Sequence, residues 1–242
     1  MTSILHLSRA RLRACRGEAL SAIAPLLIPD DKSFHAGHAH RILWLLFQDI
    51  PDATRDFLWR DEGDGKYMIL SARPPVDPHG LFELDSKPFQ PALQVGDRLA
   101  FCLRANPVVA SKVALAPEQR AIRARGKKID IVMRALHAVP ETDWNAKTGR
   151  AFQRDSIAAE VGVKWLAGQG VKAGFKLARV PVVDGYNQFP IERRKGRPAG
   201  FSVLNFSGEL EIDDPAAFLE RLPKGFGSAK AFGNGLMLIR RA

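Results

Sequence analysis

The sequence predicts an α+β protein, for three reasons. Its 242 residues are 46% hydrophobic and 26% charged, which is enough to bury one large core or two small ones. Short runs with the alternation of strands are interleaved with runs of helical periodicity. The second half follows the order helix, two strands, helix, strand, which is a ferredoxin-like order without its first strand. We therefore expect two tandem ferredoxin-like domains, over residues 1–108 and 109–242.

The first half is expected to contain a strand, a helix, a β-hairpin and a further strand. Leu43, Trp44 and Phe47 have helical spacing, and Pro51 ends that helix. An Asp-Gly turn joins the two strands of the hairpin. Five prolines between residues 74 and 91 predict an irregular stretch there. In chain order, the expected strand, helix, hairpin and strand span residues 4–10, 38–48, 55–60 with 66–73, and 98–104.

The second half is expected to contain three helices and three strands. Its first helix lacks clear caps, whereas Ile157, Val161 and Trp165 are spaced four apart and share one face of the second. Asp214 followed by Pro215 supplies an N-cap and a first-turn proline for the third. The expected helices span residues 129–139, 156–166 and 215–222, and the expected strands span 173–183, 201–212 and 235–241.

The positive charge of the chain is confined to one region. Lys and Arg number 36 and Asp and Glu number 26, a formal net charge of +10. Residues 112–197 hold 18 of the bases and 8 of the acids, so they carry the whole excess. Net charge alone does not separate a nucleic acid, a membrane surface and an acidic protein as partners, but two basic clusters beside a neutral remainder favour a polyanion. The clusters are Arg120, Arg123, Arg125, Lys127 with Lys128, and Arg193, Arg194, Lys195 with Arg197.

The composition argues against several classes of protein. No run approaches the roughly 18 apolar residues of a membrane helix, so we expect a soluble chain with no membrane partner. Cys15 and Cys102 stand far apart without a Cys-x-x-Cys motif, which argues against a disulfide scaffold and a cysteine zinc site. A reducing, cytoplasmic location fits this cysteine content best.

Three histidines, His35, His38 and His40, lie within six residues. Imidazoles at this spacing bind zinc or nickel, but no carboxylate ligand stands at a compatible spacing, so we expect no metal and no other cofactor. His40 falls in the first turn of the expected helix, where free N–H groups and the helix dipole attract a phosphate and favour the neutral imidazole. A neutral histidine beside a phosphate is a candidate general base. The alternative is that these are ordinary polar residues entering a helix.

The segment 225–235 has four glycines in eleven residues and precedes the last expected strand. It does not match the dinucleotide-binding or P-loop patterns. Its glycines permit close backbone approach to a ligand, and Lys230 with the loop amides could hold phosphates. A tight helix-to-strand connection with no ligand is an equally good interpretation of this segment alone.

Several stretches of the chain, taken together, resemble one family. They are His40-Arg-Ile-Leu-Trp-Leu-Leu-Phe47, Arg55-Asp-Phe-Leu-Trp-Arg60, residues 70–75, Phe101-Cys-Leu-Arg-Ala-Asn-Pro107, Trp165-Leu166, Phe206-Ser-Gly-Glu-Leu210 and Gly225-Phe-Gly-Ser-Ala-Lys-Ala-Phe-Gly-Asn-Gly-Leu236. In this order they resemble the CasE family, the CRISPR repeat-processing endoribonuclease of the type I-E Cascade complex. The resemblance covers most of the chain, apart from residues 18–36 and the basic middle.

The resemblance implies tandem ferredoxin-like domains of the RAMP/RRM-like kind. It also implies binding of the CRISPR repeat hairpin in precursor RNA, association with other Cascade subunits, and one metal-independent cut at the 3′ base of the hairpin to give mature crRNA. The family's catalytic histidine corresponds to His40. Family members commonly carry a tyrosine three residues earlier, where this chain has Gly37, so His38 or Lys230 is a candidate substitute.

Cleavage by the RNA's own 2′-hydroxyl would leave a 2′,3′-cyclic phosphate and a 5′-hydroxyl. Two alternatives stay open: a noncatalytic scaffold subunit that binds an RNA hairpin, and a metal-dependent nuclease that uses the three histidines. For the endoribonuclease we expect His40 and Lys230 to be catalytic. The expected RNA-binding residues are Arg41, Arg123, Arg125, Lys127, Lys128, Arg193, Arg194, Lys195, Arg197, Gly227 and Ser228.

Overall fold

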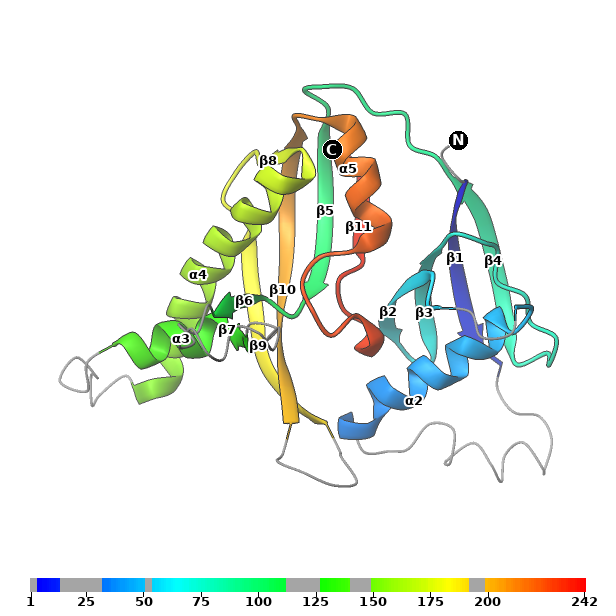
Figure 1. Ribbon diagram of the computed structural model, residues 1–242, viewed down its shortest axis with the longest axis horizontal. Helices are drawn as coiled ribbons and strands as arrows, with labels where there is room; N and C mark the ends of the chain where they lie inside the picture. The colour runs from blue at the N-terminus through cyan, green and yellow to red at the C-terminus, as the bar shows by residue number, and fades with distance from the viewer. Residues whose placement is uncertain (1–3, 14–31, 51–53, 112–126, 140–148, 192–198) are drawn as a thin grey trace, which may run out of the picture.

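The computed structural model describes residues 4–13, 32–50, 54–111, 127–139, 149–191 and 199–242 (Figure 1). Within these residues the chain forms a four-stranded and a five-stranded antiparallel sheet, each with helices on one face, and a two-stranded ribbon. The predicted α+β class is therefore confirmed. None of the described helices is long and apolar enough to span a bilayer.

The first sheet has the strand order β2-β3-β1-β4. Its core joins Leu43 and Phe47 to Trp59, Ile69 and Phe82 of the sheet, all nearly inaccessible to solvent. Helix α2 therefore packs across this sheet, as Figure 1 shows. The elements are β1 (Leu5–Leu12), α2 (Lys32–Trp44), a 3-10 turn (Leu45–Phe47), β2 (Phe57–Gly63), β3 (Lys66–Ser71) and β4 (Phe82–Phe89).

Two expectations for this half are wrong. Strand β4 lies within the stretch expected to be irregular, and it is an edge strand, the position in a sheet where a proline such as Pro88 is tolerated. Helix α2 begins at Lys32, six residues before the expected start at His38. The residues before His38 lack the apolar periodicity that marks a helix in the sequence.

The second sheet has the strand order β11-β5-β10-β8, with β9 also paired to β10. Strand β5, which we expected in the first domain, pairs with β10 and β11 and so supplies the strand that the second half had seemed to lack. The elements are β5 (Arg98–Ala105), α4 (Gly149–Ala173), β8 (Phe175–Leu177), β9 (Val182–Ile191), β10 (Ala199–Ile212), α5 (Pro215–Arg221), 3-10 turns η4 (Leu222–Lys224) and η5 (Lys230–Phe232), and β11 (Met237–Arg241).

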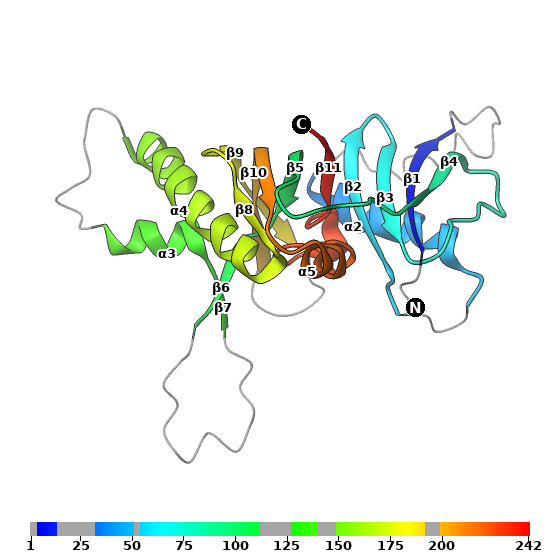
Figure 2. The same ribbon diagram turned by 90° about the horizontal axis from the view of Figure 1, so that it is seen from above.

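Between β5 and α4, the ribbon of β6 (Val108–Ser111) and β7 (Lys127–Asp130) leads into α3 (Ile131–Ala138). Figure 2 shows this ribbon projecting away from the two sheets. The expectation that α3 lacks a cap is wrong, because Asp130 accepts hydrogen bonds from the amides of Val132 and Met133. The predicted Asp214 cap of α5 is confirmed by bonds from Ala216 and Ala217.

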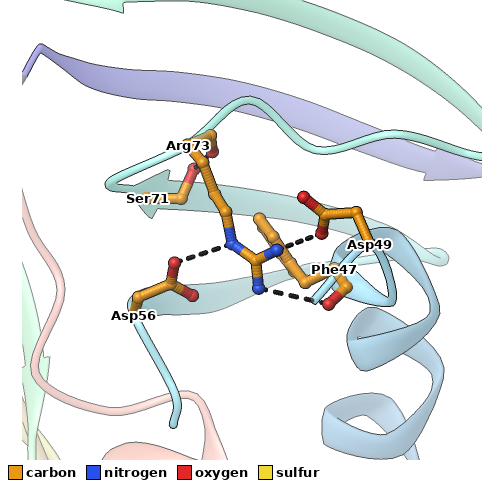
Figure 3. Close-up of polar contacts among 5 residues, drawn as sticks. All are labelled: Phe47, Asp49, Asp56, Ser71 and Arg73. Carbon is orange, nitrogen blue, oxygen red and sulfur yellow. Dashed lines mark hydrogen bonds and ion pairs between the residues drawn. The ribbon is translucent and has the colours of Figure 1, made fainter. Parts of the chain in front are cut away.

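Arg73 fastens the end of α2 to the sheet (Figure 3). Its Nε donates to Asp56 Oδ2 at 2.8 Å, its Nη2 to the carbonyl of Phe47 at 3.1 Å, and its Nη1 to Asp49. The guanidinium also lies 5.4 Å from the centroid of the Phe47 ring. Because Asp56 immediately precedes β2 and Phe47 ends the turn after α2, this one side chain fixes the helix relative to the strand.

Replacing Arg73 with alanine is expected to lower the free energy of unfolding by about 2–3 kcal/mol, since it leaves the half-buried Asp56 carboxylate without its cation. For a chain of this size the melting temperature falls by about 5–10 °C, measurable by calorimetry. Arg73→Lys keeps the positive charge but cannot make all three hydrogen bonds of the guanidinium, so it should recover only part of the lost free energy of unfolding. A melting temperature unchanged in Arg73→Ala contradicts this role.

Candidate active site

His40 lies on α2, eight residues after its first residue and beyond the reach of the helix N-terminus. The expectation that it occupies the first turn is therefore wrong, because the dipole effect fades within one turn. Its Nε2 accepts a hydrogen bond from Trp44 Nε1 at 3.1 Å, and its ring centroid lies 6.0 Å from that of Phe57. Trp44, one helical turn away, was not among the predicted site residues.

The pKa of His40 is nevertheless lowered, as the dipole argument had required, but by different causes. Burial among aromatic rings comes first, and repulsion from the Arg55 guanidinium second. Because an indole N–H only donates, the unprotonated nitrogen of neutral His40 is Nε2 and its proton is on Nδ1. That Nδ1 is buried and has no hydrogen-bond partner among the described residues.

Arg55 is the functional candidate that sequence reasoning missed. It is half-buried just before β2, two residues from Phe57, and burial lowers its pKa. It forms no hydrogen bond or ion pair with any described residue, although its charge acts on both His40 and Lys230. In the sequence, an arginine next to a strand looks the same whether it belongs to a functional site or is solvated, so no pattern identifies Arg55.

The segment 225–235 lies where η5 meets α2 and β2, between the two sheets (Figure 1). A Cβ at Gly227, where φ is +78°, would stand 2.6 Å from the carbonyl oxygen of Asn106. A Cβ at Gly233, where φ is +74°, would stand 2.9 Å from the Trp59 ring. These glycines therefore allow close packing of the chain on itself, in agreement with the interpretation of this segment as a tight helix-to-strand connection.

The same segment also brings predicted site residues together. Lys230 Nζ donates to the carbonyl of Lys224, and burial lowers its pKa, helped by Arg221, Arg55 and then Lys128. Lys128 Nζ donates to Ser228 Oγ at 3.0 Å. Lys230, Ser228 and Lys128 thus form one positively charged surface that reaches His40 through Arg55.

The remaining predicted RNA-binding residues are placed less fully. Arg41 is exposed on α2 beside His40, and Lys127 belongs to β7. The residues that lie outside the described part of the chain are Arg123, Arg125, Arg193, Arg194, Lys195 and Arg197.

Neither tyrosine of the chain stands at the place of the family tyrosine. Tyr67 is buried in the first core against Trp59, and burial raises its pKa to about 12. Tyr186 donates to Asp130 Oδ2 at 3.0 Å, and its pKa is raised to about 12, mainly by burial. Around Gly37, a Cβ would meet no atom within 4 Å.

The histidine triplet is poorly arranged as a metal site. His38 and His40 are two residues apart on a helix, so they project from different faces. Among the described residues no three histidine, cysteine or carboxylate side chains gather as a possible metal site, and the side chain of His35 lies outside that set.

Comparisons with known proteins agree with this architecture. The family model described as CRISPR associated protein matches residues 5–241. The Cascade subunit CasE of Escherichia coli K12 is 26% identical over 206 residues, covering 83% of this chain and 89% of its own. The CRISPR-associated endoribonuclease Cse3 of Thermus thermophilus is 32% identical over 163 residues, covering 63% and 60%.

A solved structure of the CRISPR endoribonuclease Cse3 bound to a 19 nt RNA matches with a TM-score of 0.63 and 25% identity, covering 99% of this chain and 100% of that one. The family model spans almost the whole chain, and the relatives carry the CasE and Cse3 names. The chain belongs to the CasE/Cse3 family of type I-E CRISPR-associated proteins.

Proposed function

We propose that this protein is a metal-independent endoribonuclease that binds the stem-loop of CRISPR repeat precursor RNA. It cleaves at the 3′ base of the stem, leaves a 2′,3′-cyclic phosphate, and delivers mature crRNA within Cascade. The observation that carries this proposal is a His40 of lowered pKa that accepts from Trp44 and lies near the half-buried Arg55, whose charge also acts on Lys230. Such a site accepts a proton and attracts a phosphate at the same place.

Both halves of the chain support tandem ferredoxin-like domains. Numbered in chain order, the strands of the first sheet take the order 4-1-3-2. The second sheet takes the same order when β8 and β9, which pair with successive parts of β10, are counted together as its second strand. In the second half α4 joins the first strand to the second and α5 joins the third to the fourth, as that fold requires. The first half keeps α2 but has no described helix between β3 and β4.

His40 is suited to act as the general base. Its lowered pKa keeps the ring neutral near pH 7, and its Nε2 presents a lone pair that now accepts the Trp44 indole proton. When the RNA 2′-hydroxyl replaces the indole at Nε2, its proton passes to His40 and its oxygen attacks the adjacent phosphorus.

The leaving 5′-oxygen needs a proton, and Lys230 is the candidate donor. Its lowered pKa makes the ammonium a stronger acid than an exposed lysine, which suits it to protonate the 5′-oxygen as the P–O bond breaks. Arg55, with no carboxylate partner among the described residues, would balance the charge that develops on the phosphorane. The products are a 2′,3′-cyclic phosphate and a 5′-hydroxyl.

A noncatalytic RNA-binding scaffold is the second candidate, favoured by Gly37 at the position of the family tyrosine. One assay separates the two functions. Labelled repeat RNA, mixed with excess protein in EDTA, is expected to yield one product ending in a cyclic phosphate, and RNA with a 2′-deoxy residue before the cut is expected to bind but stay intact. Binding of unmodified RNA without cleavage would establish the scaffold, and cleavage that needs a metal ion would overturn the proposed mechanism.

A further inference from the structure

A groove outside the candidate active site lies between the β9–β10 hairpin and the β6–β7 ribbon with α3. Its volume of about 680 Å³ lies in the range of sites that enclose small organic molecules. We call it the hairpin groove, and the residues that carry the argument are Val108, Lys128, Met133, Gln188, Phe189 and Phe201.

One part of the hairpin groove is apolar and includes two aromatic side chains. Phe189 and Phe201 face each other across the hairpin, with ring centroids 5.5 Å apart and planes 21° apart. Phe232 also stacks on Phe201, with ring centroids 5.0 Å apart, and the Arg104 guanidinium lies 5.5 Å from the centroid of the Phe189 ring, so the two rings offer the groove only the parts that stay exposed. Val108 and Met133 also line the groove. This apolar lining suits an unpaired nucleobase better than a charged or sugar group.

The polar wall of the groove is held in a fixed arrangement. Asp130 accepts from the amides of Val132 and Met133 at 2.7 and 3.0 Å, from Tyr186 Oη at 3.0 Å, and from the hydroxyl of Ser202. Its carboxylate is therefore satisfied by four donors. Gln188 Nε2 donates to Tyr186 Oη at 3.2 Å, which orients an exposed amide that can pair with the edge of a base.

The groove opens beside the candidate active site. Lys128 lines it while donating to Ser228 of the glycine-rich segment, so one ammonium group borders both sites. Such a cation favours the phosphate that accompanies a base. A base inside an A-form stem is covered by its stacked neighbours, so only an unpaired nucleotide can enter.

We propose that the hairpin groove binds the base of one unpaired nucleotide next to the repeat stem. The inference rests on the proposed function, because it assumes that the repeat hairpin is bound across the active site. It adds a contact that reads the single-stranded flank in addition to the stem.

The test uses the full-length protein and its cognate repeat RNA, carrying a 2′-deoxy residue at the cut and four unpaired nucleotides on each side of the stem. Each unpaired nucleotide is made abasic in turn, and affinity is measured at one fixed salt concentration. With the wild-type protein, one position is expected to cost about 5- to 150-fold, the range for loss of one base contact with an aromatic surface.

Val108→Phe fills the groove. Its affinity for the intact RNA should fall by about as much as the sensitive abasic position costs the wild type, and making that position abasic should then cost the variant nothing more. Val171→Phe, the same change at an exposed position of α4, is the matched control and should behave as wild type. Both variants should bind a blunt hairpin without flanks as the wild type does.

The outcomes are distinguishable. Failure of wild type to bind the blunt hairpin would overturn the proposed function itself. Two results would overturn the groove proposal alone: the hairpin binds normally but no abasic position lowers affinity, or an abasic position lowers affinity as much in Val108→Phe as in the wild type. The remaining occupant for the groove would then be an apolar side chain of a protein partner. If Val108→Phe does not fold, the abasic series on wild-type protein still decides whether any unpaired base is bound.

Discussion

Replacement of His40 by alanine is expected to slow single-turnover cleavage of repeat RNA by about 10²–10⁴-fold, the usual contribution of a positioned acid or base. Trp44 and Phe57 remain to line the site, and the charges of Arg55 and Lys230 are untouched. The variant should therefore bind the RNA with nearly wild-type affinity. The measurement is the rate of product formation on a denaturing gel with protein in excess, together with a filter-binding titration.

His38→Ala is the matched control for this experiment, because it removes an imidazole from the same helix but from a different face. It should cleave at close to the wild-type rate. An equal loss in both variants would favour a site built from several histidines, and undiminished cleavage by His40→Ala would place the general base elsewhere.

Replacement of Arg55 by methionine is expected to change both the rate and its pH dependence. A general base is active when deprotonated, so the wild-type rate should fall tenfold per pH unit below the pKa of His40, which lies under its ordinary value of 6.5. Removing the positive charge of Arg55 raises that pKa, so the acidic limb of the profile moves to higher pH. Burial still acts on the ring and keeps the limb below 6.5.

The rate on the plateau should fall as well, by about 10²–10³-fold if Arg55 stabilises the phosphorane as one preorganised donor. Arg55→Lys keeps the charge and should retain the wild-type position of the acidic limb. Arg60→Met, within β2 and on the opposite face of that strand from Phe57, is the control for loss of an arginine, and Arg60 is paired to Glu62 in the wild type. A profile of Arg55→Met that coincides with that of Arg60→Met would remove Arg55 from the site.

The local elements of the fold could be predicted from the sequence where local chemistry decides them. The Asp214-Pro215 cap, the hairpin with its Asp-Gly turn and the apolar periodicity of α2 all depend on residues a few positions apart. The assignment of β5 to a sheet could not be predicted. Its partners are β10 and β11, about a hundred or more residues later, and no property of residues 98–105 identifies them.

The candidate site, too, could be predicted only in part from the sequence. The sequence predicts His40 as catalytic through its resemblance to the CasE family and Lys230 as a candidate substitute for the family tyrosine, but its reason for a neutral histidine was wrong. The pKa of His40 depends on burial against Phe57 and on the charge of Arg55, both contributed by the chain around the start of β2. These effects exist only once α2 has packed on the first sheet.

The sequence by itself determined the α+β class, the family and two catalytic candidates, because these depend on residue identity and on order along the chain. Only the tertiary structure decided which strands share a sheet, which cation faces His40, and that a groove borders the site at Lys128. The physical reason is that desolvation, Coulomb interactions and cavity shape depend on distances in space, and folding sets those distances between residues that are remote in the sequence.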